Sequence, residues 1–240
     1  MKKKHILILL STIFVSISFS PYKLYPINIK GNGNLVTSEI NIPKFEKINS
    51  GGSAEVYFHL SPEYRVVITA DSNIIEYIEI ITRGKTLHIG NKKGYSLSFT
   101  KMLVNIYSPV LTSVSISGSG TFISDDVINA RRFEINVSGS GRIEGKIDSN
   151  NFFATISGNG RINIIGSSDS SNINISGSGR INSLDFCTNN ATVRVTGSGN
   201  ADIYVLNNLV VNISGIGRIN YRGNPRIESK IRGSGRINKI

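Results

Sequence analysis

Short stretches of alternating hydrophobic and polar residues recur along the second half of the chain, and each stretch ends in a Gly-x-Gly phrase. Ile135-Asn136-Val137 and Ile173-Asn174-Ile175 show this alternation, which has the two-residue period of a β-strand. Further short strands such as Phe152-Phe153-Ala154 and Ile203-Tyr204-Val205 lie between the glycine phrases. No long segment combines helical periodicity with helix-capping residues. The pattern therefore predicts an all-β fold.

The Gly-x-Gly phrase occurs seven times, with steps of 21, 19, 19, 20, 18 and 18 residues between the first glycines. Such regular spacing indicates that each repeat is one structural unit stacked on the next. We expect a single-stranded, right-handed parallel β-helix with one coil per repeat, in which equivalent positions lie about 4.8 Å apart. The corner glycines of the repeated Ser-Gly-x-Gly-Arg-Ile phrase are Gly118, Gly120, Gly139, Gly141, Gly158, Gly160, Gly177, Gly179, Gly197, Gly199, Gly215, Gly217, Gly233 and Gly235.

Strand parity gives these glycines a structural role. If Val137 and Ile143 point into the core, continuous alternation places Gly139 and Gly141 inward and Arg142 outward. We expect the glycines to occupy inward positions at a bend, where a side chain would crowd the core and where a positive φ is tolerated. This explanation of the phrase requires no ligand.

The segment before the repeats is irregular but also rich in strands. We expect strands at 53–60, 64–70, 85–90 and 102–107, with a turn at 50–52, whereas residues 72–82 fit either a short helix or a strand. This part is expected to form the first coils or to cap the stack, because an open end exposes unpaired backbone groups. Since no linker divides the chain, the predicted organisation is a lead-in at 21–37 followed by one domain at 38–240, irregular at 38–107 and regular at 108–240.

Residues 1–20 have the pattern of a secretory signal, with Lys2–Lys4 before a short apolar stretch. Because this stretch is shorter than the roughly 20 residues of a membrane-spanning helix, cleavage is the favoured interpretation and a retained N-terminal anchor is the alternative. The formal charge of +11 falls to +8 without the three lysines. This excess is compatible with an anionic partner but identifies none.

Four phrases, read together, indicate a family. They are "FEKINSGGSAEVYF" at 45–58, "TLHIGN" at 86–91, "IYSPVLTSVSISGSG" at 106–120 and "ISGIGRINYRGNPRIESKIRGSGRI" at 213–237. Together they resemble the putative auto-transporter adhesin head GIN domain family over residues 38–240. The resemblance implies a secreted β-helical envelope protein of a Gram-negative bacterium, located in the periplasm, at the outer membrane or on the cell surface. It supplies no catalytic residues, and we do not expect self-secretion, because no membrane barrel follows the last repeat.

Five arginines follow the second glycine of a corner and are expected to point outward. Stacking in register would place them in one column, interrupted once by Asn200. Guanidinium groups in a row, with serines beside them, can hold the sulfate, phosphate or carboxylate groups of an anionic polymer. The alternative is a solvated corner whose arginine stems only cover apolar surface. The arginines are Arg142, Arg161, Arg180, Arg218 and Arg236, and the serines are Ser138, Ser140, Ser176 and Ser178.

Other kinds of site have less support. Asp125-Asp126 is the one acidic pair, and adjacent strand residues point to opposite faces. His59 and His88 fall in separate strands, so neither a metal site nor a catalytic pair is predicted. Cys187 is expected to be a small core residue. We predict no cofactor, because the seven glycine phrases lack the third glycine and the helix of a nucleotide-binding loop.

The favoured interpretation is a secreted, non-enzymatic binding module that holds anionic polysaccharide or lipopolysaccharide through the arginine column. A structural envelope protein without a specific ligand is the second interpretation, and an enzyme acting on polysaccharides is the third. Nucleic acid is not an expected partner, because the arginines are not interleaved with aromatic residues. The pattern predicts no particular oligomeric state.

Overall fold

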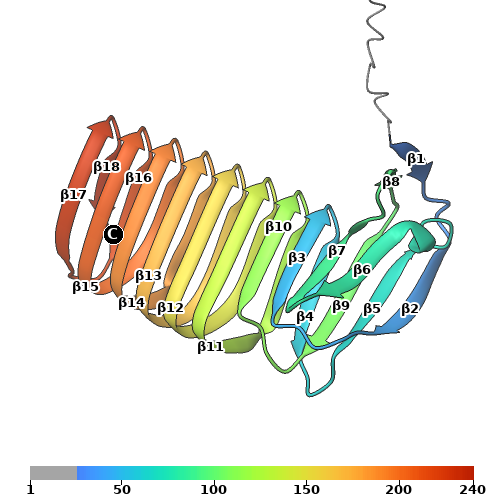
Figure 1. Ribbon diagram of the computed structural model, residues 1–240. Helices are drawn as coiled ribbons and strands as arrows, with labels where there is room; N and C mark the ends of the chain where they lie inside the picture. The colour runs from blue at the N-terminus through green and yellow to red at the C-terminus, as the bar shows by residue number, and fades with distance from the viewer. Residues whose placement is uncertain (1–25) are drawn as a thin grey trace, which may run out of the picture.

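The computed structural model describes residues 26–240, so the predicted signal segment at 1–20 lies outside the described residues. Parallel strands stack along one axis into an elongated solenoid, with a less regular part at its N-terminal end (Figure 1). The regular part comprises β10 (Ser113–Gly118), β11 (Thr121–Gly139), β12 (Arg142–Gly158), β13 (Arg161–Gly177), β14 (Arg180–Gly197), β15 (Asn200–Gly215), β16 (Arg218–Arg222), β17 (Arg226–Gly233) and β18 (Arg236–Lys239).

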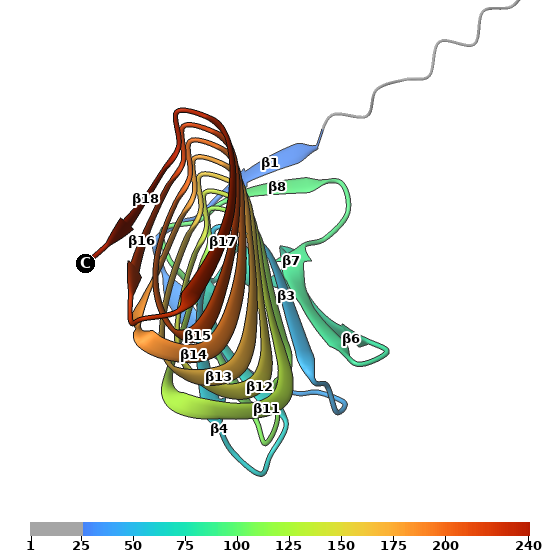
Figure 2. The same cartoon turned by 90° about the vertical axis from the view of Figure 1, so that its left-hand side faces the viewer.

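The coils superimpose when the solenoid is viewed from its C-terminal end (Figure 2). Each coil pairs in parallel with the next, and inward positions carry apolar side chains that stack on one another. Ile135, for example, pairs with Ala154, which in turn pairs with Ile173, and all three are buried. Full burial of one such isoleucine stabilises the fold by about 1.5–3 kcal/mol. The predicted all-β parallel solenoid is therefore confirmed.

The Gly-x-Gly corners stack in register, and glycine is required at the two positions of a corner for different structural reasons. Gly139 has a φ of 112°, and a Cβ there would lie 2.6 Å from the carbonyl oxygen of Gly118 in the preceding coil. A Cβ on Gly141 would instead lie 2.5 Å from Cγ2 of the core residue Ile116. The expectation that a side chain would crowd the core therefore holds for the second glycine. It is wrong for the first, where backbone conformation and the neighbouring backbone exclude a side chain.

The stack contains an earlier corner that the repeat did not reveal. Gly52 pairs with Gly118, and Glu55 pairs with Thr121, so residues 52–54 form a corner of the same kind. Ala54 stands where the later corners have their second glycine. The predicted turn at 50–52 is thus the end of β3 and the start of the first corner.

The irregular N-terminal part forms the first coils and also caps the stack. β3 and β7 extend one sheet in parallel, as do β4 and β9, whereas β2, β5 and β6 pair antiparallel at the end of the solenoid. Residues 72–82, for which the sequence fitted either a helix or a strand, contain a 3₁₀ turn followed by the start of a strand. The elements are β1 (Ile27–Lys30), β2 (Leu35–Asn41), β3 (Lys47–Gly52), β4 (Glu55–Leu60), β5 (Arg65–Asp71), η1 (Ile75–Tyr77), β6 (Ile78–Arg83), β7 (Thr86–Asn91), β8 (Tyr95–Ser98) and β9 (Met102–Ser108).

A buried carboxylate ties this cap together. Asp71 Oδ1 accepts a hydrogen bond from the backbone N–H of Gly33 at 2.7 Å, and Oδ2 accepts one from the backbone N–H of Thr100 at 2.8 Å. Burial raises the pKa of Asp71, but these hydrogen bonds outweigh it and leave the pKa below its ordinary value. The charged form of Asp71 therefore holds three distant segments in place.

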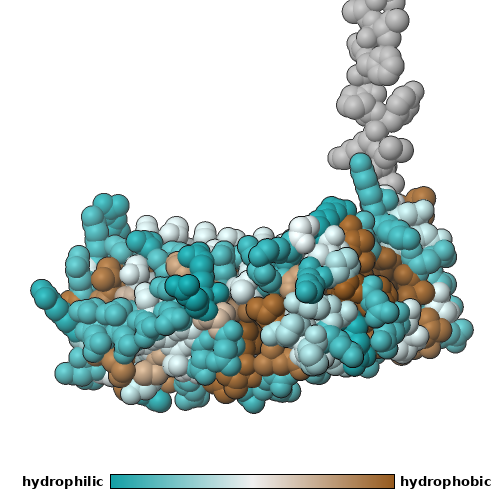
Figure 3. All heavy atoms as spheres, turned by 60° about the horizontal axis from the view of Figure 1, so that its bottom comes forward, coloured by the Kyte–Doolittle hydropathy of each residue, from teal (hydrophilic) through white to brown (hydrophobic). Residues whose placement is uncertain are grey.

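The surface differs between the two halves of the solenoid. In the view from below, hydrophobic residues gather toward the N-terminal half, whereas hydrophilic residues cover much of the C-terminal half (Figure 3). None of the helical segments in the part of the chain described has the length and apolar character needed to cross a membrane.

Candidate functional site

The predicted arginines form one column along the solenoid. Arg142 pairs with Arg161, which pairs with Arg180, and the column passes through Asn200 before it continues to Arg218 and Arg236. All five guanidinium-bearing residues are exposed. Each lies directly after the corner, on the strand that leaves it.

The charge of this column is mostly uncompensated. Within residues 26–240, Arg142 is the one column member in an ion pair, with 3.8 Å between its Nη1 and Glu144 Oε1. Both partners are largely exposed, so this pair contributes little to stability. The other four guanidinium groups are available to an anion from solvent.

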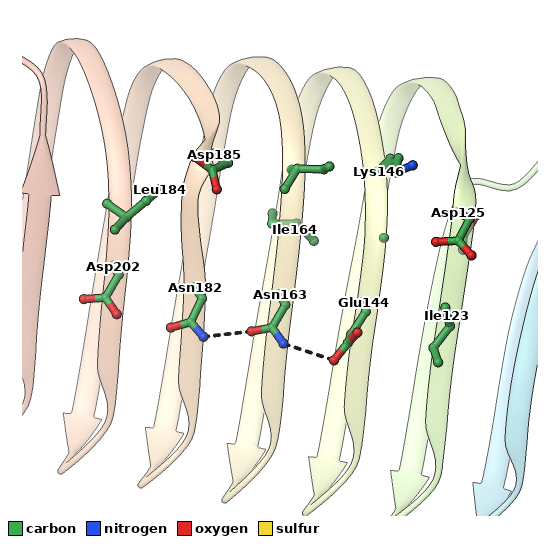
Figure 4. A pocket seen from close by; sticks show the side chains of 13 residues that line it. Ile123, Asp125, Glu144, Lys146, Asn163, Ile164, Asn182, Leu184, Asp185 and Asp202 are labelled. Atoms are coloured by element: carbon green, nitrogen blue, oxygen red, sulfur yellow. Dashed lines mark hydrogen bonds between the residues drawn. The ribbon is translucent and has the colours of Figure 1, made fainter.

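A second column runs beside the arginines, two residues further along each strand. Asn163 Nδ2 donates to Glu144 Oε1 at 3.2 Å, and Asn182 Nδ2 donates to Asn163 Oδ1 at 2.8 Å (Figure 4). On the C-terminal side, Asn220 and Asn238 continue the same pattern of donation. We call this column the amide ladder; its members are Glu144, Asn163, Asn182, Asp202, Asn220 and Asn238. The repeated Arg-Ile-Asn phrase is the sequence signal for it, although only the arginine of that phrase was predicted as a site residue.

A groove of about 520 Å³ lies over β12 and β13 next to the amide ladder. Its walls come from two irregularities in coil length. Asp125 and Asp126 are two extra residues of β11 at a register shift against β12, and β14 shifts register against β13 around Leu184. Such bulges bend a strand locally and redirect its side chains. The groove is therefore a consequence of the unequal repeat lengths.

The groove lining combines acceptors with apolar surface. Carboxylates line it from four coils, whereas Lys146 is the one basic residue of the lining. Ile165 is 42% exposed and adds apolar surface. Carboxylate and amide oxygens beside apolar side chains suit a ligand that carries hydroxyl groups. The carboxylates belong to Asp125, Glu144, Asp185 and Asp202.

The remaining candidates from the sequence do not assemble into a site. Asp125 lines the groove, whereas Asp126 Oδ2 accepts a hydrogen bond from the backbone N–H of Leu60 at 2.8 Å. His59 hydrogen-bonds Asn105 through Nε2 at 3.1 Å. In the described chain, from residue 26 onward, no three His, Cys, Asp or Glu side chains group as metal ligands.

Cys187 differs from the expectation that it belongs to the core. It is half-buried on the outward face of β14, because its neighbours Phe186 and Thr188 take the inward positions. The three-residue irregularity before it sets this parity, which the sequence pattern alone did not show.

A smaller basic groove was also missed. Arg194, Lys230 and Arg232 line a hollow of about 240 Å³ across β14, β15 and β17, together with the hydroxyl-bearing Thr196 and Ser214. These residues lie before the corner, on the flank opposite the arginine column. Basic residues therefore flank both sides of the corner near the C-terminal end.

The fold is that of a parallel β-solenoid with exposed columns of side chains along one flank. The family described as "Putative auto-transporter adhesin, head GIN domain" matches residues 44–225, and the chain belongs to this family. The predicted resemblance is thereby confirmed. No curated protein matches the chain.

Solved structures of bacterial proteins share this fold. A putative lipid binding protein from Parabacteroides distasonis is 31% identical, with a TM-score of 0.76, and the match covers 89% of this chain and 100% of the other. A putative adhesin from Parabacteroides merdae is 27% identical, with a TM-score of 0.72 and coverage of 89% and 99%. A putative adhesin from Bacteroides fragilis is 22% identical, with a TM-score of 0.84 and coverage of 88% and 100%, which shows the fold alone.

Proposed function

We propose that this protein is an exported binding module of the cell envelope that holds anionic polysaccharide or lipopolysaccharide along its arginine column. The observation that carries the proposal is the in-register run of Arg142, Arg161 and Arg180, all exposed and with a single exposed ion pair among them. Neighbouring like charges repel one another, and a polymer with repeated anionic groups relieves this repulsion at several coils at once. Such multivalent contact raises affinity without requiring a deep pocket.

The proposal assigns no catalysis to the chain. Its family and the related structures are described as adhesins or as a binding protein. The acidic pair at 125–126 points in two directions, and Asp126 is engaged with the backbone of Leu60. These observations support binding rather than turnover of a glycan.

A binding measurement with matched variants tests the proposal. The column variant replaces its five arginines with glutamine, and the control variant replaces five exposed lysines of the N-terminal part with glutamine, so both lose the same charge. The control lysines are Lys30, Lys44, Lys92, Lys93 and Lys101. Affinity for immobilised lipopolysaccharide and acidic polysaccharides is measured as the salt concentration is raised.

The column variant is expected to lose affinity by roughly 100-fold or more, with a flatter salt dependence, because its guanidinium–anion contacts are gone. The control variant is expected to change little. Equal losses of affinity in both variants would show that net charge, and not the arginine column, determines binding. Absence of binding by the native protein would favour a structural envelope role.

A lipid ligand is the second candidate, favoured by an apolar cleft at the N-terminal end. The cleft has a volume of about 350 Å³ and lies between the edge strands β2 and β6, with Val36, Ile40 and Ile78 in its lining. The Parabacteroides distasonis relative described as a putative lipid binding protein supports it. Val36→Glu should abolish binding of a fluorescent fatty acid if this candidate is correct; retained binding would reject the cleft as the site.

A further inference from the structure

One coil departs from its neighbours in both columns at once. Strand β15 carries Asn200 where the adjacent coils carry Arg180 and Arg218. The same strand carries Asp202 where the adjacent coils carry asparagine. A single step of the solenoid thus exchanges a donor for an acceptor in the amide ladder and removes one positive charge from the arginine column.

The amide ladder has a direction, and Asp202 interrupts it. At each intact step, an asparagine Nδ2 donates to the side-chain oxygen of the preceding coil. An ionised carboxylate has no hydrogen to donate, so Asp202 cannot supply Asn182 Oδ1 with the hydrogen bond that its position requires. One hydrogen bond joins Asn182 to Asn163, whereas none joins Asp202 to Asn182 (Figure 4).

The surroundings of this step indicate what an added ligand would contact. Asp202 Oδ1 accepts a hydrogen bond from Asn220 at 2.6 Å, which leaves its other oxygen and Asn182 Oδ1 as two neighbouring acceptors. Leu184, from the bulge of β14, is half-buried at the same end of the groove and offers apolar surface. Arg180 and Arg218 pair with Asn200 from its two sides, and each lies two residues before the asparagine that its own strand contributes to the amide ladder. Hydroxyl donors, an apolar ring face and nearby anionic groups are the features of an acidic sugar.

We propose that the step between β14 and β15 is a subsite for one sugar ring of an acidic polysaccharide. Two ring hydroxyls donate to Asn182 Oδ1 and to the Asp202 carboxylate, the ring packs on Leu184, and carboxylate or sulfate groups of the same polymer reach Arg180 and Arg218. This inference rests on the proposed function and adds a requirement for hydroxyl groups. A polyanion without hydroxyl groups would gain nothing from Asp202, whose negative charge would repel it.

Asp202→Asn is the decisive variant, because it keeps the shape of the side chain and supplies the missing Nδ2 donor. The completed ladder should raise the melting temperature, so a loss of binding cannot be attributed to unfolding. Affinity is measured by calorimetry for inorganic polyphosphate and for a panel of carboxylated and sulfated polysaccharides. Asp169→Asn is the matched control. Asp169 is exposed and lies away from the groove, and its carboxylate accepts a hydrogen bond from Asn150.

We expect Asp202→Asn to weaken binding of the best polysaccharide about tenfold, the effect of losing a hydrogen bond to a charged group. Polyphosphate binding should stay equal or become stronger, because a negative charge is removed. The control should leave polysaccharide affinity within about twofold, as expected for a surface change without a ligand contact.

Unchanged or stronger polysaccharide binding by Asp202→Asn would overturn the subsite while leaving the arginine column intact. The subsite would also be overturned if the native protein bound polyphosphate with the same affinity as the polysaccharides. If the native protein binds none of the anionic polymers, the proposed function is overturned as well. The sugar subsite and the arginine column thus fail by different results.

Discussion

A Cβ atom on Gly139 would lie 2.6 Å from the backbone carbonyl oxygen of Gly118, one coil earlier. The same oxygen accepts a hydrogen bond from the backbone N–H of Ser140 at 2.9 Å. The first corner glycine therefore serves the contact between coils: it lets adjacent backbones approach closely enough for their hydrogen bond. This relationship repeats along the stack and makes the corner intolerant of side chains.

Gly139→Ala should therefore destabilise the protein by about 2–4 kcal/mol, through a disfavoured positive φ and a backbone clash. Gly145→Ala is the matched control, because Gly145 has an ordinary φ and its added Cβ would have only Ile147 at 4.0 Å. Denaturant unfolding followed by circular dichroism measures both. Similar midpoints for the two variants would contradict the corner argument.

Asp71 predicts an acid-dependent loss of stability. Burial raises its pKa, but the hydrogen bonds from Thr100 and Gly33 leave it below the ordinary value of 3.8. A lowered folded-state pKa means that the contribution is fully present above pH 3.8 and is lost as the pH falls through the folded-state pKa. Asp71→Asn should be less stable than the native protein at neutral pH, and the difference should shrink in acid. A pH-independent difference in unfolding free energy would refute this.

The amide ladder should contribute measurable stability. Asn163 donates to Glu144 and accepts from Asn182, so Asn163→Ala removes two hydrogen bonds and should cost about 1–2 kcal/mol. Asn159→Ala serves as the control, since Asn159 is an exposed residue at the corner of the same coil. Thermal unfolding compares the two; an equal loss would show that the ladder bonds add nothing to stability.

Asn200→Arg should complete the arginine column. The added guanidinium is expected to strengthen binding of inorganic polyphosphate by roughly three- to tenfold at low salt, with a steeper salt dependence. Asn207→Arg adds the same charge at an exposed position on the outer part of β15. If both variants strengthen binding equally, net charge rather than the column governs affinity.

The repeat revealed most of the architecture because stacking imposes the same constraints on every coil. Three features recur with the coil length: inward residues such as Ile135 and Ile173, the corner glycines and the arginine column. Because they recur at a fixed spacing, the linear sequence is enough to reveal them. The corner at 52–54 escaped notice because Ala54 replaces the second glycine and an irregular part separates it from the next corner. The amide ladder was also present in the repeat, as the asparagine after each Arg-Ile.

The sequence by itself therefore determined the solenoid, its corners and the row of arginines, since periodic residues report periodic packing. Only the tertiary structure decided where unequal coils absorb their extra residues. That choice placed Asp125 and Leu184 at the groove and turned Cys187 outward, whereas the pairing of Asp202 with Asn182 follows from the repeat itself. The physical reason is that extra residues redirect a strand locally, and an odd number of them also changes the parity of the residues that follow.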